Sequence, residues 1–212
     1  MTAAELLREL AERTRSAPEP LGTGAYHYVH TRGSHRRTKR FLSRSGDSVV
    51  TSSIEPFERR QWIAADGSGR IEVMKDGELV QPSGDYGPGE LVLPFVDNVP
   101  GPGNTPSVIK AFREIWSTQV VPPSRQRLLL QSLAECADLS TDTAPRGFAG
   151  QVAVTHVDRA RQVRNLLVFD QDTGELIGAE SIELEQVISH VEWLITGYCE
   201  TTAEPPRPPA VR

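Results

Sequence analysis

The acidic segment Asp170-Gln-Asp172-Thr-Gly174-Glu175 places oxygen-bearing side chains at alternate positions, as the first half of a calcium-binding loop does. The later ligands of such a loop do not follow at their fixed spacing, and apolar segments flank the acids on both sides. Asp-Thr-Gly is also a common turn sequence, because aspartate bonds to nearby backbone and glycine accepts a positive φ. We therefore expect a hairpin turn here and no metal site.

The histidines and serines give no catalytic pattern. His27 and His30 are three residues apart in an extended segment, so they point to opposite faces and do not reach one metal ion. Ser68 and Ser83 lie near glycines, but neither is in a nucleophile elbow, and no base is paired with them. The turn at residues 66–69 does not open a helix, as a phosphate-binding loop would. We expect a protein without catalytic residues, cofactor or metal.

Six basic residues lie between positions 32 and 44 with no acidic residue among them. Proteins that bind single-stranded nucleic acid usually combine such charge with several stacking aromatic side chains, and here only Phe41 interleaves. We expect a solvated loop or the exposed face of an edge strand, where positive charge discourages aggregation, and no nucleic-acid partner. The candidate residues for contact with a protein partner are Arg36, Arg37, Lys39 and Arg40.

The composition is that of an ordinary globular protein. The 212 residues are 38% hydrophobic and 24% charged, with a formal net charge of -5, which gives no overall attraction to nucleic acid. We expect a single domain over residues 1–203 and a disordered Pro-rich tail over residues 204–212. No run has the roughly 18 apolar residues of a membrane span, and no signal peptide is present, so the chain as written is expected in the cytoplasm. Cys136 and Cys199 are expected to be buried free thiols, with a disulfide as the alternative.

The first half of the chain is predicted to be one helix followed by antiparallel strands. Thr2 and Glu5 have the spacing of a capping box, and leucines at helical spacing follow, so a helix is expected over residues 3–15. Strands are expected at residues 25–31 and 49–54, the second interrupted at Glu55-Pro56.

Residues 59–80 alternate apolar and polar side chains between two turn signals, at residues 66–69 and at Asp76-Gly77. This pattern predicts an antiparallel meander with one buried and one solvated face. The alternation leaves open whether the face bearing Trp62 or the face bearing Ile63 points inward.

The second half is predicted to contain two helices and then four strands. Residues 82–104 should be a long loop held by an apolar cluster, and Thr105-Pro106 should begin a helix that ends before Val120. A second helix is expected from Ser124 to about Ala137. The final strands are expected at residues 151–157, 164–170, 175–182 and 187–196, the last with Val187, Val191, Trp193 and Ile195 on its buried face.

Three segments together resemble a known protein family. They are the opening helix with Gly24-Ala-Tyr-His-Tyr-Val29, the segment Gln61-Trp-Ile-Ala-Ala-Asp-Gly-Ser-Gly-Arg70, and the helix at 124–139 with Leu166-Leu-Val-Phe-Asp-Gln-Asp-Thr-Gly-Glu-Leu-Ile-Gly178. The chain resembles an actinobacterial family of membrane-anchored extracytoplasmic proteins, several of which are encoded near extracytoplasmic-function sigma factors. The resemblance extends over about residues 3–200.

The resemblance implies a fold similar to the lipoprotein carrier LolA and to the amino-terminal part of the sigma-factor regulator RseB. That fold is α+β: a curved antiparallel sheet, an unclosed half-barrel, covered by an N-terminal helix and a central pair of helices. No catalytic residues are known for the family, so none are carried over. The sequence as written lacks the family's membrane anchor. The chain is expected in the cytoplasm as written, and it would be extracytoplasmic and membrane-tethered if the family's anchor belongs to it, so the compartment stays open.

Our leading hypothesis is a non-enzymatic binding or sensing domain, in which the concave face of the sheet and the helices enclose an apolar groove. Its ligand would be a lipid, a lipidated protein or a hydrophobic peptide. The candidate ligand-binding residues are Tyr26, Tyr28, Trp62, Phe95 and Trp193, and the alternative for each is an ordinary core position. The second hypothesis is a protein-interaction module that regulates a sigma factor or a membrane partner. An enzyme with an unrecognised site is the third, because residues far apart in sequence converge in folds.

Overall fold

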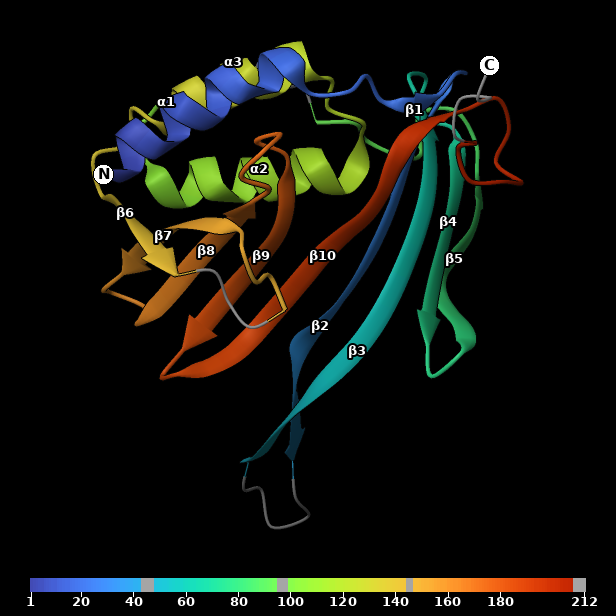
Figure 1. Ribbon diagram of the computed structural model, residues 1–212. Helices are drawn as coiled ribbons and strands as arrows, with labels where there is room; N and C mark the ends of the chain where they lie inside the picture. The colour runs from blue at the N-terminus through green and yellow to red at the C-terminus, as the bar shows by residue number, and fades with distance from the viewer. Residues whose placement is uncertain (43–47, 95–98, 144–146, 208–212) are drawn as a thin grey trace.

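The computed structural model describes residues 1–42, 48–94, 99–143 and 147–207. Within these ranges the chain forms one ten-stranded sheet and three α-helices (Figure 1). The strand order is β5-β4-β3-β2-β10-β9-β8-β7-β6, and the two outermost strands of the described sheet do not pair with each other, so it is open. All neighbours along this order are antiparallel, and only the short β1 (Leu21–Gly22) runs parallel, beside β10. The predicted α+β class with an unclosed antiparallel sheet is confirmed.

Three helices lie over one face of the sheet, which we name the helix face; the opposite face is the outer face (Figure 1). Helix α1 (Ala3–Arg13) begins with the predicted capping box: the Glu5 N–H donates to Thr2 Oγ1, and the Thr2 N–H donates to Glu5 Oε2. Helix α2 (Thr105–Thr118) lies nearest the sheet, while α3 (Pro123–Leu133) lies beside α1. α3 ends before the predicted Ala137.

The main hydrophobic core fills the space between these helices and the helix face. Leucines of α1 and α3 meet Phe112 and Trp116 of α2, whose rings stack with centroids 5.4 Å apart. From the sheet side, Val29, Leu167 and Trp193 contribute. Burial of these apolar side chains stabilises the arrangement, because each fully buried large residue contributes about 1.5–3 kcal/mol.

β2 (Tyr26–Leu42) and β3 (Ser48–Ala64) form a hairpin that is much longer than predicted. The expected break at Pro56 is wrong: β3 runs through it, with Pro56 opposite Ser34 of β2. β4 pairs with β3 only from Glu58 onward, so β3 has no neighbouring strand at Pro56 on the β4 side. The missing N–H of Pro56 therefore costs no hydrogen bond on that side. The basic stretch is therefore strand in its described part, so the loop expectation is wrong there. β2 is an inner strand only as far as His35, where its pairing with β10 ends, and beyond His35 it has a neighbouring strand on one side only, as the edge-strand expectation had it.

The predicted meander is confirmed in β4 (Gly69–Lys75), which pairs with β3 and with β5 (Glu78–Tyr86). Ile63 is on the helix face, and Trp62 is on the outer face. β6 (Leu139–Thr143) was not predicted; it precedes the four strands that were, β7 (Val152–Asp158), β8 (Val163–Phe169), β9 (Leu176–Glu183) and β10 (Gln186–Cys199).

A β-bulge changes the expected burial pattern of β10. The pairing register with β2 shifts between Trp193 and Ile195, so the strict alternation of the sequence does not continue past the bulge. Val191 and Trp193 belong to the core as predicted, whereas Ile195 is 38% exposed.

The C-terminal segment after β10 folds back over the sheet. The Trp62 Nε1–H donates to the carbonyl of Glu204, 3.0 Å away, and Pro206 is buried. Within the expected tail, Pro206 is thus buried while Glu204, Pro205 and Arg207 are exposed, and residues 208–212 lie outside the described ranges. No helix in the described part of the chain has the length and apolar character needed to cross a membrane.

Candidate functional site

The structure does not bring the five predicted ligand-binding residues together. Tyr28 and Trp62 are on the outer face, 1% and 3% exposed, with ring centroids 5.0 Å apart. Together with Cys199 they form a small cluster against which Tyr26 packs, beneath the C-terminal segment. Trp193 is on the opposite face, in the main core, where its Nε1–H has no hydrogen-bond partner among the described residues. Phe95 lies outside the described residues.

An open cleft of about 550 Å³ lies on the helix face, between α2 and the sheet. We name it the α2 cleft. One wall is the side of α2 from Pro106 to Thr118, and the other comes from Arg59 of β3, Val163 and Asn165 of β8, and the β7–β8 turn. The sequence predicted an apolar groove between the sheet and the helices, whereas this cleft is lined mostly by charged and polar residues and by none of the five predicted ligand-binding residues.

Arg113 extends from α2 to the helix face of the sheet. Its Nη1 and Nη2 groups donate to Ser181 Oγ of β9 and Ser189 Oγ of β10, each at 3.0 Å. The Ser181 hydroxyl in turn donates to Asn165 Oδ1 at 2.8 Å, which directs its oxygen lone pairs toward Arg113. Burial lowers the pKa of the Arg113 guanidinium, because desolvation disfavours its charged form.

Arg59 lines the same cleft from β3. Side chains alternate between the two faces along a strand, so Arg59 shares the helix face with Gln61 and Ile63. Its Nε atom is buried without a hydrogen-bond partner, and burial lowers the pKa of its guanidinium. No carboxylate of the described residues pairs with Arg59 or Arg113, whereas most surface arginines have an acidic neighbour.

The remaining charges of the cleft balance one another. Lys110 Nζ lies 3.5 Å from Glu114 Oε1, and Arg161 Nε lies 3.8 Å from Asp158 Oδ2. With these two pairs set aside, the α2 cleft holds two arginines whose charge no described residue neutralises. The arrangement favours binding of an anionic group.

The sequence analysis missed both arginines. One signal was present for Arg113: it follows Ile109 by four residues and precedes Trp116 by three, so it lies at the edge of the apolar stripe of α2. A charged residue at such a position is unusual and needs a partner or a function. Arg59 gave no comparable signal, because the alternation of β3 did not reveal which face is covered by helices.

The four basic residues predicted to contact a partner lie on a protruding part of the β2–β3 hairpin. β10 pairs with β2 only as far as His35, so residues 36–42 and 48–54 form a two-stranded ribbon that projects from the sheet (Figure 1). Arg36 pairs with Glu183 and Arg37 with Glu55, while Lys39 and Arg40 are exposed with no acidic partner among the described residues. Val50 and Ile54 of the ribbon are 53% and 52% exposed.

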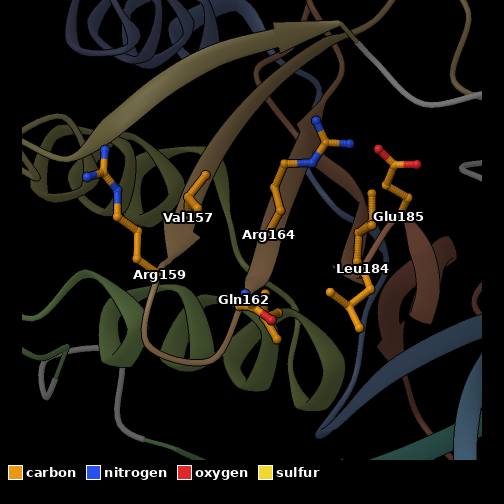
Figure 2. Close-up of a pocket in the computed structure, with 8 residues that line it drawn as sticks. Val157, Arg159, Gln162, Arg164, Leu184 and Glu185 are labelled. Atoms are coloured by element: carbon orange, nitrogen blue, oxygen red, sulfur yellow. The ribbon is translucent and has the colours of Figure 1, made fainter.

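A second open hollow, of about 720 Å³, lies near the β7–β8 and β9–β10 turns (Figure 2). Figure 2 shows Val157 and Arg164 on neighbouring strands, with Leu184 and Glu185 at the facing turn. Arg164 already donates to Asp142 at 3.1 Å. The other arginine of its lining, Arg159, is exposed, so this hollow has no buried cation to hold a ligand as the α2 cleft has.

Turn structure explains the remaining candidates for chemistry. Asp170 Oδ1 accepts hydrogen bonds from the backbone N–H groups of Asp172 and Thr173, which closes the predicted turn. His27 and His30 point to opposite faces: His27 Nδ1 accepts from the Val120 N–H, and His30 contacts Glu58. In the described ranges, no group of three or more His, Cys, Asp or Glu side chains is placed to hold a metal ion.

Cys136 and Cys199 are free and buried in separate clusters.

Comparisons with known proteins give similarity of structure only. No family model and no curated protein matches the sequence. Among solved structures, the chain is similar to MucB in complex with MucA(peri), with 17% sequence identity, a TM-score of 0.38 and 95% of this chain covered. It is also similar to MucB alone, with 17% identity, a TM-score of 0.35 and 97% of this chain covered. The matches span 57% and 60% of the two MucB chains.

Proposed function

We propose that this chain is a non-enzymatic binding or sensing domain that holds a hydrophobic ligand, such as a lipid, a lipidated protein or a peptide, in the α2 cleft. The observation that carries the proposal is the open space of about 550 Å³ between α2 and the helix face, next to the main hydrophobic core. Typical ligand pockets have volumes of roughly 300–1,000 Å³.

The apolar part of the cleft is supplied by three residues. Pro106 and Ile109 come from the first half of α2, and Val163 comes from the start of β8. An apolar group placed between them would lose contact with water on both sides, which supports binding by about 25 cal/mol for each Å² buried.

Nile red, an uncharged dye that fluoresces in apolar surroundings, tests this proposal. Ser117 lines the cleft from α2, and we expect S117W to fill the space and weaken dye binding by about tenfold or more. The matched control is S124W, at an exposed serine of α3. Circular dichroism should show that both variants are folded. Equal dye binding by the two variants, or none by the wild type, would refute the proposal.

We propose a protein-interaction module, regulating a sigma factor or a membrane partner, as the second candidate function. The supporting observation is the projecting ribbon of residues 36–42 and 48–54, which combines unpaired cations with exposed aliphatic side chains. Its excess positive charge favours a partner with an acidic surface, because opposite potentials increase the rate of association.

Charge reversal tests this second candidate. The variant R37E/K39E/R40E leaves Arg36 in place, because the ion pair with Glu183 connects the base of the ribbon to β9. A control variant, R8E/R15E/R159E, reverses three exposed arginines elsewhere. A partner captured by wild type and by the control, but not by the ribbon variant, is expected. Capture of the same proteins by all three would contradict the module.

A further inference from the structure

We propose that Arg59 and Arg113 form an oxyanion-binding site inside the α2 cleft, and that the ligand of this cleft is an amphipathic anion: a carboxylate or phosphate group attached to an apolar chain. The inference rests on the proposed function and specifies the ligand class of the same site. Its starting observation is that two guanidinium groups line one cleft while no carboxylate of the described residues pairs with either.

Partly buried arginines without counter-charges are costly to the fold. A guanidinium stays protonated in proteins, so burial removes hydration without removing the charge. Structural arginines usually recover this cost through an acidic partner. Arg59 and Arg113 recover none of it in this way. A bound anion would supply the missing charge, and it would give the buried Nε–H of Arg59 an acceptor.

The surroundings of Arg113 hold it in position for this task. Its two donors to Ser181 and Ser189 fix the plane of the guanidinium against β9 and β10. Hydroxyl oxygens accept hydrogen bonds without neutralising charge, so the positive charge remains available to a ligand. The bond from Ser181 to Asn165 orients the hydroxyl and strengthens this support.

The lining also indicates what is attached to the anion. Ile109 and Val163 line the same cleft as the two arginines, so a ligand that contacts both sets has a charged and an apolar part. A small inorganic anion would leave the apolar wall without a partner. An uncharged apolar ligand would bury the two guanidinium groups further without compensation.

Displacement of Nile red provides the measurement. The competitors are dodecanoate, dodecyltrimethylammonium and dodecyl maltoside, used below their micelle-forming concentrations, with acetate as the free carboxylate. We expect dodecanoate to bind at least about tenfold more tightly than the cationic and uncharged amphiphiles, and acetate to displace nothing. R113Q and R59Q should each weaken dodecanoate by about tenfold, which corresponds to one lost charge-assisted contact, and leave Nile red binding nearly unchanged.

Two control variants separate charge from structure. R8Q removes an exposed arginine of α1 and should have no effect. R113K keeps a positive charge and should retain the preference for dodecanoate over dodecyltrimethylammonium.

If Nile red binds but the three amphiphiles compete equally, the oxyanion site is refuted while the proposed binding function stands. If acetate displaces the dye as well as dodecanoate does, the site takes free anions and the amphipathic ligand is refuted. If Nile red does not bind at all, the proposed function itself fails.

Discussion

His190 lies between two carboxylates on the outer face, and this arrangement depends on its protonation. Nδ1 is 2.9 Å from Glu180 Oε1, and Nε2 is 3.1 Å from Glu192 Oε1. Only the imidazolium ion donates from both nitrogens. The hydrogen bond to Glu180 is the main cause that raises the pKa of His190 above its ordinary 6.5, and Arg32 and the ring of Phe148 complete the surroundings.

The raised pKa of His190 predicts a loss of stability on the alkaline side. A group with a raised pKa in the folded state stabilises fully below its unfolded pKa, about 6.5, and loses that contribution as the pH rises through its folded pKa. The pKa of Glu192 is lowered from 4.5: burial alone would raise it, but hydrogen bonds from Arg32 and His190 outweigh this. The network is therefore complete between about pH 4.5 and 6.5.

We expect the difference in unfolding free energy between wild type and H190Q to fall by about 1 kcal/mol between pH 6 and pH 9, since the pair is partly solvated. Urea unfolding at the two pH values measures it. A difference that stays constant over this range would show that His190 remains in one protonation state.

At the scale of elements, β2 holds the two halves of the sheet together, with β10 on one side and β3 on the other. Gly33 of β2 is paired with Val191 of β10. A Cβ atom built at this position would be 2.1 Å from the carbonyl oxygen of His190, and that oxygen is backbone, which cannot rotate away. The close pairing of β2 and β10 therefore requires glycine here.

We expect G33A to destabilise the protein by about 1–3 kcal/mol or more, because one strand must move to remove the overlap. Thermal unfolding monitored by circular dichroism is the measurement. The control is G101A, at a glycine with no heavy atom within 4 Å of a built Cβ, which should change stability little. Similar melting temperatures for the two variants would show that the sheet accommodates the methyl group.

At the scale of the whole molecule, the C-terminal segment closes the outer face over Trp62. The three tryptophans are all buried, and the indole N–H of Trp62 donates to the carbonyl of Glu204 in this segment, whereas Trp116 and Trp193 belong to the main core. Removal of this segment should therefore expose one tryptophan and leave Trp116 and Trp193 in the core.

A chain ending at Ala203 should show red-shifted tryptophan emission and lose about 1–3 kcal/mol of stability, from the lost hydrogen bond and the exposed indole. A chain ending at Arg207 keeps Glu204 and Pro206 and is the matched control. An unchanged spectrum after truncation at Ala203 would mean that the packing of residues 204–207 does not protect Trp62.

We propose that residues 1–203 unfold as one domain, because a single sheet and one main core connect both halves of the described chain. Urea unfolding should give coincident transitions by tryptophan fluorescence and by far-ultraviolet circular dichroism. Two separate transitions would show that the β3–β5 region unfolds independently of the helix-covered part.

The sequence by itself determined the local elements of this protein. The capping box at Thr2 and Glu5, the apolar stripe of α2 and the turns of the meander depend on contacts between residues close in the chain. Such contacts leave a periodicity of 3.6 or 2 and characteristic turn residues, so their positions and the α+β class were predictable.

Only the tertiary structure decided which faces are covered and which charges stay unpaired. The bulge after Trp193 reversed the expected burial of Ile195. The predicted ligand residues Tyr28 and Trp62 are buried together on the outer face, where Trp62 bonds to the C-terminal segment. Arg59 and Arg113 come together only because α2 crosses the curved sheet. These outcomes depend on contacts between residues far apart in the chain. The alternation within one strand shows which side chains share a face, but it does not show what packs against that face.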